Sequence, residues 1–266
     1  MNILYIGELV GKAGLWAFKR GLPLLKNSYK PDFIIVNANS LTGGGGLGYN
    51  HSVYLHKLGA DAISLGECAF YKKDLVANMA KIPYVVRPAN LIKEAPGYGY
   101  RFFSVDGAKI AISVLLGQNS FGRIHANNPY TEFPLLMEKL SAETAFIIVD
   151  FHAQATAEKK ILEELAVQNG LASAIIGSHT KVLSADAGIT KGLAYISDAG
   201  RTGAVYSVGG SQIKSRIAEY QSGIPDWTHE ADGPCEIQGL CIILNDKGRS
   251  EKIESFRLPV GDFKIE

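Results

Sequence analysis

Apolar runs of strand length alternate with amphipathic segments along the first part of the chain. Residues 3–6, 33–36 and 62–65 are largely apolar runs that predict buried strands. Apolar positions recur with a helical period over residues 15–25, and residues 49–58 also predict a helix. Strands that alternate with helices at this interval indicate crossover connections and a parallel sheet.

Two hairpins are predicted later in the chain. Residues 98–116 contain two apolar segments on either side of Asp106-Gly107, a dipeptide that favours a tight turn. Residues 235–258 likewise contain two segments that flank the polar turn 245–248. These hairpins predict antiparallel strands at the ends of a sheet system that is otherwise parallel.

Residues 145–150, 156–168 and 173–176 continue the strand–helix–strand pattern between the two hairpins. Parallel strands combined with hairpins predict an α/β fold in which two mixed sheets pack face to face with helices outside. No linker rich in proline, glycine or serine divides the chain. We therefore expect residues 1–266 to form a single domain.

The composition is that of a globular protein without a charge bias. The chain is 47% hydrophobic and has a formal net charge of +1, which argues against nonspecific binding to nucleic acid. We find no basic leader followed by a long apolar stretch, and no apolar run long enough to span a bilayer. The three cysteines match no zinc or redox spacing and fit a reducing compartment. We expect a cytoplasmic protein without membrane contact.

Short polar clusters follow five of the predicted strands at the point where each ends. Ligands bind at this edge in open α/β sheets, so the clusters are expected to meet at one face. Each residue alone would more often be solvated or structural, but five clusters at one edge favour a shared site. Carboxylate, carboxamide and imidazole groups delivered in this way suit a first-row metal ion. The residues are Glu8, Asn39, Ser40, Glu67, Cys68, His152, His179 and Lys181.

Several longer segments occur in one order along nearly the whole chain. They are ILYIGELVG at the N-terminus, GADAISLGE, VRPANL at 86–91, DFHAQATAEK at 150–159, IIGSHTKVLSAD at 175–186 and AYISDAGRTG at 194–203. This series resembles the YmdB-type metallophosphoesterases, a bacterial family. The resemblance implies a calcineurin-like αββα sandwich with two metal ions at the sheet edge. It also implies hydrolysis of phosphodiesters, with 2′,3′- or 3′,5′-cyclic nucleotides as substrates.

The resemblance assigns two retained metal ligands and several changed ones. His152 in DFHA and His179 in GSHT match the family's histidines. The family's first aspartate corresponds to Glu8, its bridging glutamate to Asn39, and the asparagine that follows to Ser40. The family's asparagine ligand, its catalytic histidine and its last histidine ligand are replaced here by Glu67, Cys68 and Lys181.

The changed residues argue against two bound ions. Asn39 is neutral and cannot bridge two divalent cations as a carboxylate does. Cys68 stands at the general-acid position, where a thiol with a reference pKa of about 8.5 is a poor proton donor. Lys181 cannot coordinate a cation while it is charged. We expect Lys181 to pair with Glu8 where the first metal would lie; the alternative is that it points to solvent.

One metal site is expected to remain. Glu67, His152, His179 and Asn39 would frame it, and two histidines with a carboxylate suit manganese, iron or zinc. The alternative is an empty pocket in which Glu67 pairs with a protonated histidine.

Substrate contacts and partners are less strongly indicated. Ser40 is one candidate contact, and Arg123 and His125 are others because their polar loop could face the pocket, although a solvated loop is the alternative. The expected ligand is a small molecule that contains phosphate. Self-association into a homo-oligomer and a protein partner are further expectations.

These changes together favour a divergent family member that hydrolyses phosphodiesters weakly or not at all and serves as a binding or assembly module. A second hypothesis is a one-metal phosphodiesterase for cyclic nucleotides or related diesters, in which Lys181 holds a phosphate in place of the other ion. A third is a structural subunit whose pocket has lost its role. The retention of His152 and His179 favours the second hypothesis.

Overall fold

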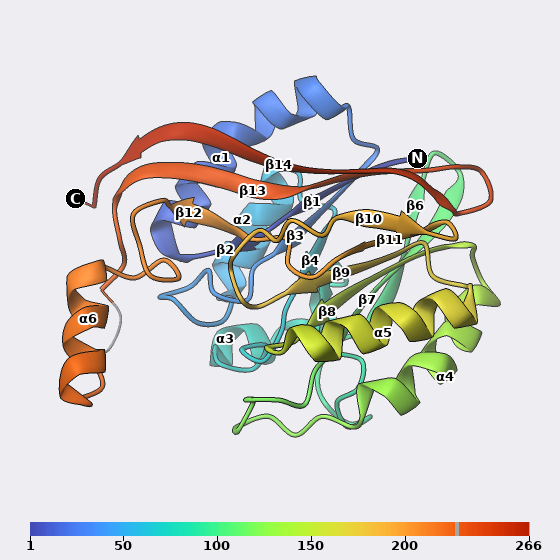
Figure 1. The fold of residues 1–266 in the computed structure, drawn as a ribbon, viewed down its shortest axis with the longest axis horizontal. Coiled ribbons are helices and arrows are strands. Elements are labelled where there is room, and N and C mark those ends of the chain that lie inside the picture. Colours follow the sequence, from blue (N-terminus) through green and yellow to red (C-terminus); the bar gives the residue numbers. More distant parts are fainter. Residues whose placement is uncertain (227–228, 266) are drawn as a thin grey trace.

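Two β-sheets pack face to face at the centre of the molecule (Figure 1). The computed structural model describes residues 1–226 and 229–265. The first sheet has eight strands in the order β2-β12-β13-β1-β3-β4-β5, with β14 paired to β13. Its strands are β1 (Asn2–Ile6), β2 (Glu8–Leu9), β3 (Phe33–Asn37), β4 (Ala62–Ser64), β5 (Val85–Val86), β12 (Arg201–Ala204), β13 (Gly233–Leu244) and β14 (Ser250–Phe263).

The second sheet has six strands in the order β10-β11-β9-β8-β7-β6. They are β6 (Tyr100–Val105), β7 (Ala108–Leu116), β8 (Phe146–His152), β9 (Ala174–Ser178), β10 (Gly188–Thr190) and β11 (Leu193–Ile196). Strands β7, β8, β9 and β11 are parallel neighbours, and the two edge strands are antiparallel. Both sheets are therefore mixed.

Side chains of the central strands alternate between separate cores because successive residues point to opposite faces. Ile3 and Tyr5 of β1 pack between the sheets, whereas Leu4 and Ile6 pack toward α1 and α2. A third core joins the second sheet to α4 and α5. Helices thus cover both outer faces, which confirms the predicted sandwich. The helices are α1 (Gly11–Tyr29), α2 (Tyr49–Leu58), α3 (Lys73–Val76), η1 (Met79–Lys81), α4 (Pro129–Ser141), α5 (Thr156–Asn169) and α6 (Ile213–Ser222).

Both predicted hairpins form. Strands β6 and β7 pair around Asp106-Gly107, and β13 and β14 pair over a longer range than predicted. The C-terminal hairpin is not an appendage, because β13 lies antiparallel beside β1 near the middle of the first sheet.

Helix α6 lies at one end of the molecule, apart from the two layers of sheet (Figure 1). None of its residues is buried, and its sequence pattern had not predicted a helix. Within residues 1–226 and 229–265, no helix has the length and apolar character needed to cross a membrane.

Candidate functional site

The eight predicted strand-end residues meet where the parallel strands of both sheets end. The first sheet and its following loops supply Glu8, Asn39, Ser40, Glu67 and Cys68, and the second supplies His152, His179 and Lys181. The backbone after β9 is unusual, since His179 and Lys181 have φ angles of 97° and 63° in the left-handed region. Non-glycine residues seldom adopt this conformation, and it is concentrated at functional sites.

Glu67, His152 and His179 form a triad of metal-ligating groups. The Nε2 atom of His152 lies 2.5 Å from Oε2 of Glu67 and 3.1 Å from Nδ1 of His179. The latter nitrogen lies 3.4 Å from Oε1 of Glu67. One ligand atom from each residue falls within 4.8 Å of the other two. Two imidazole nitrogens and a carboxylate suit a first-row divalent ion, so the residues fit the metal that the sequence predicted.

Ser178 determines which nitrogen of His152 carries the proton. The hydroxyl oxygen of Ser178 lies 2.6 Å from Oδ1 of Asp150, and a carboxylate can only accept, so Ser178 donates its one proton there. Ser178 must therefore accept from Nδ1 of His152, which lies 2.8 Å away. A neutral His152 is thus protonated at Nδ1 and directs the lone pair of Nε2 toward Glu67 and His179.

Asp150 ties this arrangement to the opposite sheet. Its Oδ2 atom accepts hydrogen bonds from the hydroxyls of Tyr5 and Ser64, both at 2.6 Å, and from Nδ2 of Asn37 at 3.2 Å. All four residues are buried. Burial and the nearby Asp150 carboxylate raise the pKa of Tyr5 well above its ordinary value, so Tyr5 remains a donor. Sequence reasoning missed this network, whose signal is a buried polar group within each of four largely apolar strands.

Asn39 supports the loop that carries Glu67. Its Oδ1 atom accepts from the backbone N–H groups of Gly66 at 2.8 Å and Cys68 at 3.0 Å. Its Nδ2 atom donates to Oε2 of Glu67 at 2.9 Å. The two backbone donors define the orientation of the amide, so Asn39 presents a donor to the triad and not the ligand oxygen that was predicted.

Glu8 forms a second polar group beside the triad. It is buried, its Oε1 atom accepts a hydrogen bond from Ser40, and Nζ of Lys181 lies 3.5 Å from the same oxygen. Its Oε2 atom is buried without a hydrogen-bond partner in the described part of the chain. A buried carboxylate is costly without a positive partner. Lys181 supplies that partner and points inward, as predicted.

Opposite charges within the triad shift its ionisation. Burial opposes the charged form of Glu67, but His152 and His179 outweigh it and lower the pKa of Glu67 below its usual range. Burial would likewise lower the pKa of His152, but Glu67 at 2.5 Å outweighs it and raises this pKa. Without a metal the two residues therefore favour an ion pair, and a bound cation would replace that proton.

Cys68 lies beside the triad but cannot readily ionise. Its side chain is buried, and burial raises the pKa of the thiol, with Glu67 and Glu8 adding to the effect. This environment keeps Cys68 a neutral thiol at physiological pH.

A cavity of about 290 Å³ opens beside the triad. Two triad residues line it together with Tyr71, Phe121 and Arg123. The ring of Phe121 meets that of His179 edge-on, with 5.0 Å between the centroids. Of the predicted substrate contacts in this loop, Arg123 lines the cavity, whereas His125 is exposed and is not among its lining residues. Tyr71 and Phe121 were not predicted, because their loops carry no motif of their own.

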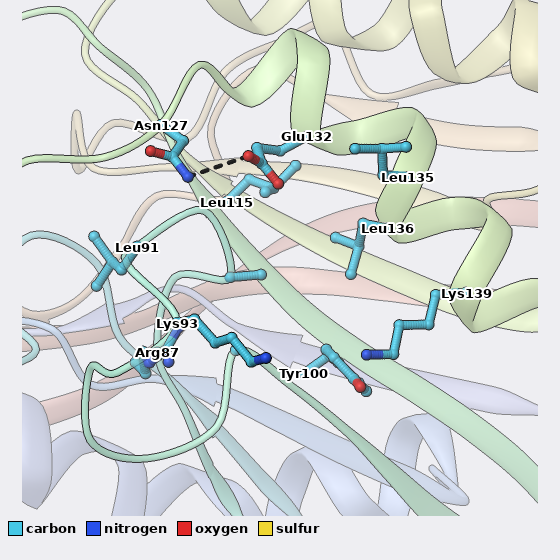
Figure 2. Close-up of a pocket in the computed structure, with 12 residues that line it drawn as sticks. Arg87, Leu91, Lys93, Tyr100, Leu115, Asn127, Glu132, Leu135, Leu136 and Lys139 are labelled. Carbon is cyan, nitrogen blue, oxygen red and sulfur yellow. Dashed lines mark hydrogen bonds between the residues drawn. The ribbon is translucent and has the colours of Figure 1, made fainter.

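A second cavity, of about 360 Å³, lies between α4 and the segment that contains VRPANL (Figure 2). Figure 2 shows Asn127 and Glu132 at one end and Lys93, Tyr100 and Lys139 at the other. None of the triad residues lines it. The guanidinium of Arg87 donates to three backbone carbonyls of the same segment, which gives this residue a structural role.

Comparisons with known proteins find relatives that match nearly the whole chain. Residues 4–256 match a family described as YmdB-like protein. A Bacillus subtilis (strain 168) relative, 34% identical over 256 residues that cover 96% of each chain, is named 2′,3′-cyclic-nucleotide 2′-phosphodiesterase. The structure of a novel phosphatase from Mycoplasma pneumoniae has a TM-score of 0.92 at 30% identity, covering 98% of this chain and 94% of that one. A hypothetical protein from Thermus thermophilus gives 0.90 at 28% identity, covering 98% and 100%.

The prediction of a non-hydrolytic binding or assembly module is wrong. The Bacillus relative, which matches nearly end to end, is named as a phosphodiesterase, and this chain keeps Glu67, His152 and His179 in a metal-binding arrangement. The error came from giving the lost bridging carboxylate and the lost general acid more weight than the metal-ligating residues that remain. In space, Glu67 supplies an anion to the histidines and Lys181 supplies a cation to Glu8, so the site keeps its charges.

Proposed function

The chain belongs to the YmdB-like protein family, and from this premise we propose that it is a metal-dependent phosphodiesterase that opens 2′,3′-cyclic nucleotides. The observation that carries the proposal is the triad of Glu67, His152 and His179, in which Ser178 accepts from Nδ1 of His152, so that Nε2 can bind a cation in place of a proton. The name of the Bacillus relative supports the choice of substrate.

We assign one divalent ion, manganese, iron or zinc, to the triad. Such an ion would polarise a phosphoryl oxygen and lower the pKa of a water molecule. Lys181 takes the part of a second cation, because its ammonium lies beside Glu8 at the same edge of the sheets and carries the positive charge that a phosphate oxygen needs. Glu8 in turn orients Lys181, and Ser40 orients Glu8.

Hydrolysis adds water to phosphorus and breaks one of the two ring P–O bonds, and a proton ends on the oxygen that leaves. Cys68 is unsuited to deliver this proton, because burial raises the pKa of its thiol. We assign the delivery of this proton to solvent. The reaction is then slower than it would be with a general acid, but it still proceeds.

The test is hydrolysis of 2′,3′-cyclic AMP by the purified chain with manganese, iron or zinc in excess. We expect turnover to a nucleoside monophosphate, and a loss of at least ~100-fold in His152→Ala and His179→Ala. Tyr220→Ala serves as a control, because Tyr220 is 81% exposed on α6. Turnover that survives both histidine changes would place the reaction elsewhere and overturn the proposal.

The cytoplasmic location, the homo-oligomer and the protein partner stay predictions. The three cysteines, Cys68, Cys235 and Cys241, are free and buried, which supports a reducing compartment.

A further inference from the structure

Two aromatic side chains and one arginine face the cavity beside the triad. Tyr71 follows β4 of the first sheet, and Phe121 and Arg123 follow β7 of the second. The cavity is therefore closed on two sides by loops from different sheets, with Glu67 and His179 also in its lining. Its volume of about 290 Å³ is close to the lower end of the range for small-ligand sites, about 300–1,000 Å³.

Tyr71 is exposed yet held in place. Half of its surface is open to solvent (50%), although it lies beside the partly buried Glu67. Its backbone N–H donates to the carbonyl of Cys68 at 3.1 Å. The glycine-rich loop packs against it, since a Cβ atom at Gly46 would lie 3.0 Å from Cβ of Tyr71 and one at Gly45 would lie 3.6 Å from its ring. The absence of a side chain at Gly46 therefore lets this loop approach the base of the Tyr71 side chain closely.

Phe121 reaches the same cavity from the opposite loop. Its ring lies with the centroid 5.0 Å from that of His179 and 6.0 Å from that of His152. Arg123, two residues later, is exposed and forms no ion pair within residues 1–226 and 229–265. An aromatic ring and an unpaired guanidinium thus lie on one short loop beside the metal ligands.

Resting on the proposed function, we propose that this cavity is the subsite for the base and ribose of the substrate, with Tyr71 and Phe121 as stacking surfaces and Arg123 as a polar contact. Every base offers a flat face, so aromatic side chains bind bases with little regard to sequence. A guanidinium can stack on a base or donate to its oxygens and to a phosphate. The enzyme should therefore prefer nucleoside cyclic phosphates to cyclic diesters without a base, and discriminate weakly among the four bases.

The experiment compares two substrates in matched variants. One is 2′,3′-cyclic AMP, and the other is glycerol 1,2-cyclic phosphate, which has the same five-membered cyclic diester and no base. For Tyr71→Ala and Phe121→Ala we expect kcat/KM to fall about 5- to 150-fold on the nucleotide, the size of one lost stack, and less than 3-fold on the glycerol ester. Tyr71→Phe should keep the wild-type ratio, because it keeps the ring. An equal fall on both substrates, or no fall on either, would overturn the proposal.

Two further measurements separate this inference from the proposed function. Lys139 lines the cavity of Figure 2, and Lys139→Ala should leave the KM for 2′,3′-cyclic AMP unchanged. A higher KM in Lys139→Ala, with an unchanged KM in Tyr71→Ala, would show that the base binds in that cavity and not beside the triad. If wild type hydrolyses neither substrate, the proposed function fails, and equilibrium binding of adenosine 3′-monophosphate decides the subsite. Binding that weakens at least 5-fold in Tyr71→Ala and not in Tyr220→Ala would support it. The same affinity for adenosine 3′-monophosphate in wild type, Tyr71→Ala and Tyr220→Ala would overturn the subsite proposal, and so would a lack of binding to wild type.

Discussion

The ammonium nitrogen of Lys181 lies 3.5 Å from the Oε1 atom of Glu8, a carboxylate whose side chain is fully buried. The pair joins a loop after β9 of the second sheet to β2 of the first. In the two-metal family that this chain resembles, the corresponding positions would hold a cation. Under the proposed function, the pair would place a fixed positive charge of the protein where that family has an exchangeable ion.

Removing the ammonium should destabilise the fold. Lys181→Met leaves the buried carboxylate of Glu8 without its positive partner, and we expect a loss of about 2–3 kcal/mol, below the ~3–5 kcal/mol of a fully buried pair because Lys181 is partly exposed. Urea unfolding of the metal-free protein measures this. The double variant Glu8→Gln with Lys181→Met should recover most of the loss, since no orphaned charge remains. A double variant no more stable than Lys181→Met would show that the loss does not come from an orphaned carboxylate.

The hydroxyl of Ser178 should control metal affinity without touching the metal. In Ser178→Ala, Nδ1 of His152 loses its acceptor and the ring loses its preferred tautomer and orientation. We expect metal affinity to fall about 10- to 100-fold, as for other residues that support metal ligands. Ser113→Ala is the control, because Ser113 is also buried in the second sheet but donates to the carbonyl of Gly99. Titration with zinc and a competing chelator measures both. Equal affinities would refute the tautomer argument.

Cys68 should be nearly dispensable for turnover. Burial raises the pKa of its thiol, so Cys68 neither ionises nor donates effectively at the position that the resemblance assigns to the family's general acid. We expect Cys68→Ala to retain kcat on 2′,3′-cyclic AMP within about 3-fold, far less than the ~10²–10⁴-fold contribution of a working general acid. The pH profile of kcat should keep its shape as well. A fall of ~100-fold together with loss of the alkaline limb of the pH profile would identify Cys68 as the proton donor.

The convergence of the site could be predicted from the sequence because parallel strands share one edge. Glu8, Glu67, His152, His179 and Lys181 each follow a strand whose apolar run is clear, so the order of elements is enough to bring them together. The role of each residue is harder to predict from the sequence, because it depends on contacts with residues that are distant along the chain. The N–H groups of Gly66 and Cys68 fix the orientation of the Asn39 amide, and sequence spacing does not predict these two hydrogen bonds.

Other features depended on tertiary structure alone. The pattern of β13 predicted a hairpin strand, but its place beside β1 follows from how the C-terminus returns to the first sheet. Tyr71 and Phe121 lie in loops whose positions are set by contacts with Gly46 and His179. The mistaken function had a different source, because the lost carboxylate and imidazole were given more weight than Glu67, His152 and His179, which the folded chain groups together.

The number of bound metal ions tests two assignments, that of one ion to the triad and that of Lys181 to the place of a second cation. Protein purified without added metal, analysed by elemental analysis after dialysis, should contain close to one manganese, iron or zinc ion per chain, since only the triad among the described residues groups three metal-ligating side chains. Lys181→His removes the fixed charge beside Glu8 and adds a neutral imidazole, so we expect a second ion to bind, weakly, because Asn39 still cannot bridge the pair. Lys181→Arg is the control, as it keeps the charge and should bind one ion. Two ions in the wild-type chain would show that Lys181 does not stand in for a cation. An unchanged count in Lys181→His, with no rise under excess metal, would show that Glu8 is not part of a latent second site.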